Sequence, residues 1–336
     1  MWNSRLISSA VIAIVGYTLA AYAPVARSAA ITPEKTVPAS PGQNVTFMPR
    51  GTIWLMALDF GGPRGGSVQW KKFFANTIVT GFHRMQQRIR RTLGLNTTKQ
   101  IRSLWAFGAT EGPRFGAFIL DTTVAAKTIT NRLEKNAATT PDLYDGIKIF
   151  RVKNNFGRPP NRRSGTLFLA VIDPGIVLGA MNEKLLEQSL DSHLGIKKSL
   201  SLKSHLFHEW QAGQPFYFSF VHLQKAIDEA QNPLNVPPQV RQIRSVYLMA
   251  GSNSGAVELH GYLLMLNAEA AARSAARLKL LKKMAYHANT GANATDRQMI
   301  LAGLIEHLKF SAEKKRVVIE WQMPYTLLRH LAPPRH

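Results

Sequence analysis

The sequence predicts an α+β protein in which duplicated strand–strand–helix units form antiparallel-rich sheets covered by helices. One segment occurs twice: residues 101–109 read Ile-Arg-Ser-Leu-Trp-Ala-Phe-Gly-Ala, and residues 243–251 read Ile-Arg-Ser-Val-Tyr-Leu-Met-Ala-Gly. Each copy is followed by a second apolar run, at 117–120 and 263–266, and then by an Ala-rich stretch of helical character. The expected strands outnumber what helical crossovers require, and many neighbours are close enough for hairpins. Both observations favour antiparallel pairing with helices on one face.

The first expected elements precede the repeat. Residues 31–50 carry scattered prolines among Ser, Thr and Gly and are expected to form a semi-extended linker. Residues 52–58 have the continuous apolar pattern of a buried strand. After the glycine loop 61–66, one apolar stripe at helical spacing predicts a helix that Gly94 ends. The stripe consists of Phe74, Ile78, Phe82, Met85, Ile89 and Leu93.

The first copy of the repeat predicts two strands and a helix that Asp121 caps, then a hairpin, a short strand and a helix that Asn182 caps. Their ranges are 101–109, 115–120, 121–135, 144–150 with 166–172, 176–178, and the residues after Asn182. The hairpin tip between residues 154 and 165 is basic and has no core residue.

The second half repeats this order. The expected elements are a strand with alternating Phe216, Phe218 and Phe220, the repeat strands, a helix capped by Asn267 with Leu278, Leu280 and Leu281, a helix through Ile300, Leu304 and Leu308, the strand 317–323, and a short helix opened by Pro324. The chain therefore divides into two related α+β subdomains, 51–200 and 201–332.

The N-terminal 30 residues are expected to be an export signal. Arg5 precedes an uncharged run from Leu6 to Ala23, and the small residues that follow suit cleavage after Ala30. The alternative is an uncleaved anchor, since this run is just long enough to span a bilayer. The expected location is periplasmic or extracellular, or tethered by that segment.

The composition restricts the chemistry and the partners. The chain has no cysteine, which excludes disulfides, zinc–thiolate sites, iron–sulfur clusters and thiol nucleophiles. It carries 42 Lys and Arg against 20 Asp and Glu, a net charge of +22. Such an excess favours an anionic membrane surface, an envelope polymer or an acidic protein as partner. Because the protein is expected to be exported, no nucleic acid is expected, and no small-molecule cofactor is indicated.

No motif defines a catalytic centre. The glycine loop 61–66 lacks the Lys-Ser/Thr of a phosphate-binding loop, and no nucleophile elbow is present. The segment 205–209 could present two histidines and a glutamate, but its spacing matches no zinc-peptidase pattern and favours a partly exposed helix. A carboxylate pair could arise among residues at strand ends or in strands. These are Asp59, Asp121, Asp173 and Glu320.

Basic residues gather in clusters with few interleaved acids. The clusters are Arg84/Arg88/Arg90/Arg91, Arg158/Arg162/Arg163, Arg273/Arg277/Lys279/Lys282/Lys283 and Lys314/Lys315/Arg316. A single cluster is an ordinary solvated face, but together they favour an anionic surface as ligand. The candidate surface-binding residues are Arg84, Arg88, Arg91, Arg158, Arg162 and Arg163.

Four short motifs resemble a family of exported bacterial proteins, common in acidobacterial genomes and without an assigned function. They are Tyr144-x-Gly146-x-Lys148-Ile149, the run from Asp173-Pro174-Gly175 to Gly179, Gly261 before the helix capped by Asn267, and Met323-Pro324-Tyr325. The resemblance spans residues 50–332 and implies an exported α+β protein. It implies no catalytic or ligand residue.

These observations lead to a functional expectation with one alternative. The first expectation is a non-catalytic, exported, envelope-associated protein with a basic surface for an anionic partner. The alternative is an envelope hydrolase that acts on an anionic polymer or lipid. An enzyme should have a concave site with at least two convergent polar groups, whereas a surface binder should spread its charge over a convex face.

Overall fold

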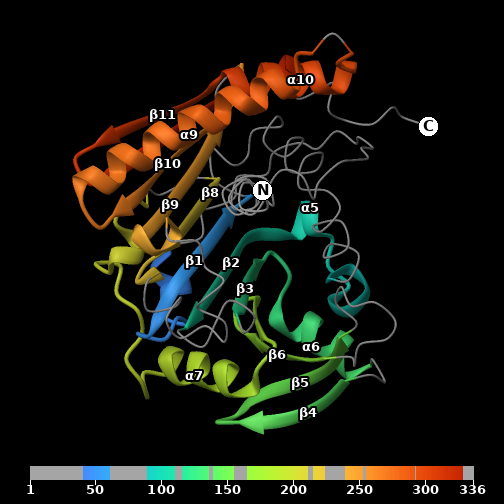
Figure 1. The fold of residues 1–336 in the computed structure, drawn as a ribbon. Coiled ribbons are helices and arrows are strands. Elements are labelled where there is room, and N and C mark those ends of the chain that lie inside the picture. The colour runs from blue at the N-terminus through green and yellow to red at the C-terminus, as the bar shows by residue number, and fades with distance from the viewer. Residues whose placement is uncertain are drawn as a thin grey trace.

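The structure of the chain is a computed structural model (Figure 1). It describes residues 41–60, 89–109, 116–135, 139–154, 165–210, 215–223, 239–252, 255–291 and 293–327. The expected export signal, the glycine loop and the basic hairpin tip all lie outside the described residues. Within them, no helix is both long and apolar enough to cross a bilayer.

One antiparallel sheet of twelve strands runs through the described part of the molecule. Its order is β11-β12-β10-β9-β8-β1-β2-β3-β7-β6-β5-β4. The strands are β1 Thr52–Asp59, β2 Ile101–Ala109, β3 Ala117–Thr122, β4 Thr139–Tyr144, β5 Ile147–Asn154, β6 Gly165–Ile172, β7 Ile176–Ala180, β8 Phe216–Phe220, β9 Ile243–Ser252, β10 Ala256–Met265, β11 Leu308–Glu313 and β12 Arg316–Pro324. The predicted α+β class with antiparallel pairing is confirmed. Because β1 pairs with β8, the two halves of the chain share one sheet.

Short and long helices connect the strands. They are α2 Pro41–Val45, α5 Thr97–Gln100, α6 Ala126–Glu134, α7 Glu183–His193, α9 Ala268–Ala288 and α10 Asp296–Glu306, with 3₁₀ turns η2 His205–Phe207 and η4 Val240–Gln242. Residues 89–93 are the described end of the predicted stripe helix. Gly94 ends it as predicted: its φ is +65°, and its N–H donates to the carbonyl oxygen of Arg90 at 3.0 Å.

Helices pack on both faces of the sheet, and not on one face as the sequence suggested. Leu186 of α7 packs in the same core as Leu178 of β7, whereas Ile129 of α6 packs with Val177. Because successive side chains of a strand point to opposite faces, α6 and α7 lie on opposite faces. Directly paired residues of neighbouring strands link Val177 to Trp321 of β12, so both side chains lie on the same face of the sheet. Helices α9 and α10 pack on this face, as α6 does.

The predicted helix cap at Asp121 is wrong. Asp121 lies in β3 and is buried, and its carboxylate accepts a hydrogen bond from Arg102 Nε at 3.1 Å. Helix α6 begins after Ala125, which makes no side-chain cap. The prediction for Asn267 is confirmed, since its Oδ1 accepts from the Ala270 amide at 2.8 Å. Asn182 occupies the cap position of α7, but its side chain bonds to no first-turn amide.

Three element boundaries also differ from the prediction. Leu308 begins β11 instead of extending the preceding helix, because residues 308–313 pair with β12. Tyr144 belongs to the separate edge strand β4. Pro324 ends β12, and the predicted short helix begins directly after it, at residue 325. Part of the expected linker 31–50 is packed: Phe47 and Met48 are fully buried in the core beneath α7.

Candidate functional site

Of the six predicted surface-binding residues, the structure describes one. Arg91 is exposed on the helical turn that ends at Leu93. Arg84, Arg88, Arg158, Arg162 and Arg163 lie outside the described residues. The grouping of these six residues into one surface therefore stays a prediction.

The largest described basic element is α9. Its sequence favours a helix because it is rich in Ala, Leu, Lys and Arg, begins at the Asn267 cap, and carries Glu269 in its first turn. The side turned to the sheet is mostly small: Ala270, Ala271 and Ala275 are buried with Leu278. Alanines allow the helix axis to approach the sheet closely, which leaves the long side chains on the other sides of the helix.

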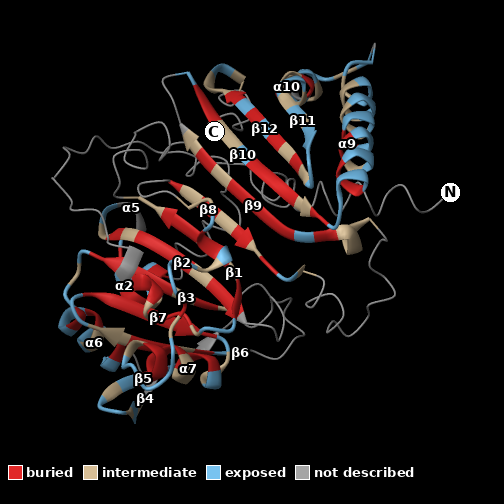
Figure 2. Cartoon of the chain, turned by 90° about the vertical axis from the view of Figure 1, so that its left-hand side faces the viewer, coloured by how far each residue is buried: buried red, intermediate tan, exposed pale blue. Residues whose placement is uncertain are grey.

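Helix α9 carries five cations and one acid, and all of them except the half-buried Lys282 are exposed. Figure 2 shows α9 at the margin of the molecule, with most of its outward side exposed. The cations are Arg273, Arg277, Lys279, Lys282 and Lys283, and the acid is Glu269. Glu269 forms an ion pair with Arg273 one helical turn later. The remaining four cations have no ion-pair partner within the described part of the chain, so α9 presents a net positive field.

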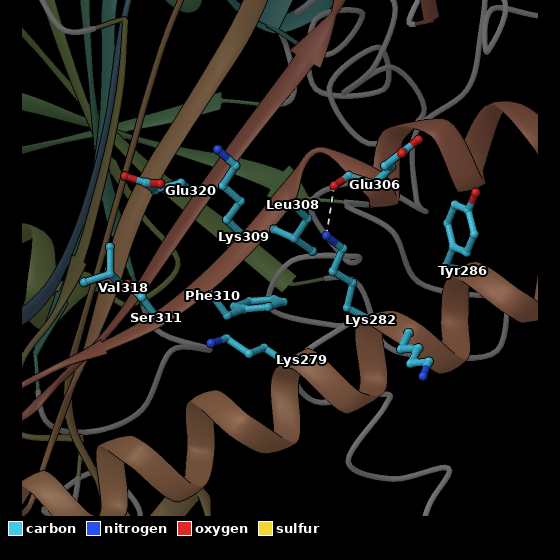
Figure 3. A pocket seen from close by; sticks show the side chains of 11 residues that line it. Lys279, Lys282, Tyr286, Glu306, Leu308, Lys309, Phe310, Ser311, Val318 and Glu320 are labelled. Carbon is cyan, nitrogen blue, oxygen red and sulfur yellow. Dashed lines mark hydrogen bonds between the residues drawn. The ribbon is translucent and has the colours of Figure 1, made fainter.

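A shallow hollow of about 740 Å³ lies between α9 and the edge strand β11 (Figure 3). Lys279, Lys282 and Lys283 line it from the helix, and Lys309 lines it from the strand. Lys282 Nζ donates to the main-chain oxygen of Glu306 at 2.9 Å. The apolar floor is formed by Leu308 and Phe310, while the carboxylates of Glu306 and Glu320 lie at its margin and offset part of the charge.

The sequence 205–209 serves to attach a loop to the second half of the sheet. Glu209 Oε1 accepts from the Tyr262 hydroxyl at 3.2 Å and lies 3.7 Å from Arg316 Nη1. The Arg316 guanidinium stands 4.3 Å from the centroid of the Tyr262 ring. Burial, followed by the charge of Glu209, raises the pKa of Tyr262, which keeps the hydroxyl protonated as a donor. Across the described ranges, no group of three or more His, Asp or Glu could hold a metal ion.

Two of the candidate carboxylates share one register row of the sheet. Asp59 pairs with Ser103, and Ser103 pairs with Asp121 on its other side. Burial raises the pKa of Asp121, while the Arg102 guanidinium, 2.9 Å away, opposes that change. Asp121 is therefore an ion-paired structural carboxylate in β3. This pairing accounts for its burial without a catalytic role.

A second basic hollow lies at the end of α7. It has a volume of about 790 Å³ and contains Arg50, Lys197, Lys198, His205 and His222 with several serines. Lys197 is paired with Asp191 at 2.6 Å, so only part of this charge is available. Compared with α9, the charge here is less concentrated and has no continuous helix to organise it.

Comparison with known proteins adds little. No family model matches the chain, and no curated protein matches it. Among solved structures, crystal form I of TP0453 is similar with a TM-score of 0.43 and 7% identity, and covers 85% of this chain and 95% of that chain. Crystal form III of TP0453 gives a TM-score of 0.47 and 8% identity over 85% and 96% of the two chains. Likeness of this degree says nothing about what this chain does.

Sequence reasoning identified the cations of α9 but missed their neighbours. The pattern through Leu308 predicts a helix, whereas residues 308–313 form β11, and this strand places Lys309 at the hollow beside α9. Leu280 was assigned to the helix without its direction, and the structure places it on the exposed side with Met284. The signal was present in the spacing: Leu280 lies two residues from buried Leu278, on the other side of the helix.

Proposed function

We propose that the protein is a non-catalytic, exported, envelope-associated protein whose basic surface binds an anionic partner. The carrying observation is α9, where the exposed cations Arg277, Lys279 and Lys283 have no described ion pair and lie along one margin of the molecule. The net charge of +22 supports a long-range attraction toward the same partner. The expected export signal supports the location, and the clusters around Arg88 and Arg162 would add to the attraction.

The expected strength follows from the number of charges. Each Lys or Arg near an anionic surface contributes about 1 kcal/mol. These three exposed cations of α9 would therefore contribute about 3 kcal/mol at low salt, which corresponds to reversible binding. Exposed charges are screened beyond about 8 Å at physiological ionic strength, so the interaction should weaken as salt rises.

We also infer that the two halves arose by duplication of one strand–strand–helix unit. The strand orders β1-β2-β3-β7-β6 and β8-β9-β10-β12-β11 correspond position by position, which supports this inference. In this correspondence α6 and α9 follow equivalent hairpins and lie on the same face. An experimental structure in which 243–265 does not superpose on 101–122 would contradict the duplication.

The binding proposal is tested with two triple variants of equal charge change. In the first, Arg277, Lys279 and Lys283 are changed to Gln; all three are exposed on α9. In the control, Lys127, Lys135 and Lys184 are changed to Gln; all three are exposed near α6 and α7. Vesicles with phosphatidylglycerol and an acidic polysaccharide serve as probes, at low and high salt. The α9 variant should lose about 1 kcal/mol of binding free energy per charge, and the control should lose less.

The two variants separate a local surface from a general excess of charge. Equal losses in both variants would mean that the charge acts without a defined site. Absence of binding at low salt, or binding that is indifferent to salt, would contradict the proposal. Shortening of the polysaccharide by the purified protein would instead support the alternative of an envelope hydrolase.

A further inference from the structure

A line of apolar side chains runs along the outward side of α9. Leu280 and Met284 are 59% and 58% exposed, unlike most large apolar residues of the described core. They follow Ala272 and Ala276 at intervals of four residues, so the four side chains form one row on the helix surface. Leu280 and Met284 thus extend an exposed apolar row over the C-terminal half of the helix.

Cations flank this row on both sides. At 100° per residue, Arg273 and Arg277 lie on one side of the row, and Lys279 and Lys283 lie on the other. All four are exposed. Their long aliphatic stems can extend along an apolar surface while the charged ends reach polar groups. A helix with a central apolar row and cationic margins matches the boundary between lipid headgroups and acyl chains.

We propose that α9 lies flat on an anionic phospholipid bilayer, with Leu280 and Met284 at the headgroup–acyl boundary and the four flanking cations at lipid phosphates. The proposal rests on the proposed function and names its partner. The helix is 21 residues long, so it offers a contact line of about 31 Å. Cations alone are enough to bind a soluble anionic polymer or an acidic protein loop. Exposed Leu and Met side chains, in contrast, add binding free energy only when they leave water for an apolar phase. The combination therefore favours lipid.

The first experiment reports on insertion at a single residue. Because the chain has no cysteine, Met284→Cys can carry one environment-sensitive fluorophore. The matched control is Leu143→Cys on the edge strand β4, where Leu143 is 74% exposed. Vesicles of phosphatidylglycerol and phosphatidylcholine should shift the emission to the blue at position 284 and not at position 143. Both variants contain the whole chain, so attachment through residues 1–30 would be common to them.

The second experiment separates lipid from other anions. The double change Leu280→Gln and Met284→Gln keeps helix formers at exposed positions, so folding should be unaffected. It should weaken vesicle binding about tenfold, because two large apolar side chains no longer leave water. Binding to an acidic polysaccharide should be unchanged.

The outcomes distinguish the two proposals. If salt-sensitive binding persists while position 284 shows no shift, or if the double change weakens both probes equally, the bilayer proposal is overturned and the anionic-partner proposal stands. If no anionic probe binds in a salt-sensitive manner, the proposed function itself fails.

Discussion

The strands β7 and β12 hold similar positions in the two halves of the sheet but are buried differently. Each is the second strand of a hairpin, β6–β7 and β11–β12, and each joins that hairpin to the end of a strand trio. All residues of β7 are buried, whereas β12 alternates and exposes Glu320 and Gln322. The cause is visible beside β7, where α7 packs on the face that carries Leu178. Hence β7 is covered on both faces, whereas β12, near the edge of the sheet, is covered on one face and keeps a polar face.

This difference indicates where each half can interact. In the first half, the apolar side chains of α7 are used to fill the core, since Leu185, Leu186 and Leu190 are all buried. In the second half, α9 packs through alanines and leaves leucine, methionine and cations outside. The leucines of α7 therefore contribute to the core, whereas the large side chains of α9 are available at the surface.

The largest expected effect contrasts one leucine of each helix. Leu186→Ala should reduce the free energy of unfolding by about 2–5 kcal/mol, because it leaves a cavity between α7 and the sheet. Leu280→Ala should change it by less than about 0.5 kcal/mol, because that side chain is exposed. Denaturant unfolding measures both. Comparable losses of unfolding free energy would mean that Leu280 is packed as tightly as Leu186, which would contradict the difference between the two helices.

A smaller effect is expected at the helix caps. Asn267→Ala should cost about 0.5–2 kcal/mol, because the Ala270 amide loses its acceptor. Asn182→Ala at the start of α7 should cost less, since its side chain caps no amide. Thermal unfolding of both variants gives the comparison. An equal or larger loss at Asn182 would show that the cap geometry does not set these costs.

The sequence predicts the strands well because their patterns are local. The continuous apolar run of β7 predicts a strand that is buried on both faces, and the alternation of apolar and polar residues in β12 predicts a strand that is buried on one face. Asp121 was assigned as a cap because an acid before an Ala-containing helix is typical of one. Its contact with Arg102 comes from the neighbouring strand β2, a pairing that no local pattern contains. Similarly, the cations of α9 were evident, but the direction of Leu280 depends on which side of the helix meets the sheet.

A change of stability in acid is expected from Asp191 in the first half. Hydrogen bonds from Lys197, and then from Tyr144 at 2.6 Å, lower the pKa of Asp191, and the same contact raises the pKa of Tyr144 to about 12. Because the folded-state pKa lies below the unfolded value, this carboxylate stabilises the fold above about pH 4. That stability is lost as the pH falls through the folded-state pKa. Tyr144→Phe should raise the pKa of Asp191 in an NMR titration and diminish the loss of stability in acid.

The control for this effect lies in the second half. Tyr262→Phe removes a hydroxyl that donates to Glu209 and makes no described contact with Asp191. It should leave the pKa of Asp191 unchanged. A shift of equal size in both variants would mean that the titration reports general loosening and not the contact between Tyr144 and Asp191.

The smallest effect on the free energy of unfolding is expected from removing the acids in the first turns of α7 and α9. Glu269→Gln removes a pair with Arg273 and a favourable charge at the helix start, which should cost about 0.5 kcal/mol at low salt and little at 1 M salt. Glu183→Gln removes a similar exposed pair with Arg151 at 3.0 Å and should also have a small effect.

The two changes add the same positive charge, yet only Glu269→Gln frees a cation on α9. Vesicle binding should therefore strengthen for Glu269→Gln and stay near the wild-type value for Glu183→Gln. Equal strengthening would mean that binding follows the net charge of the whole molecule and not the local charge of α9.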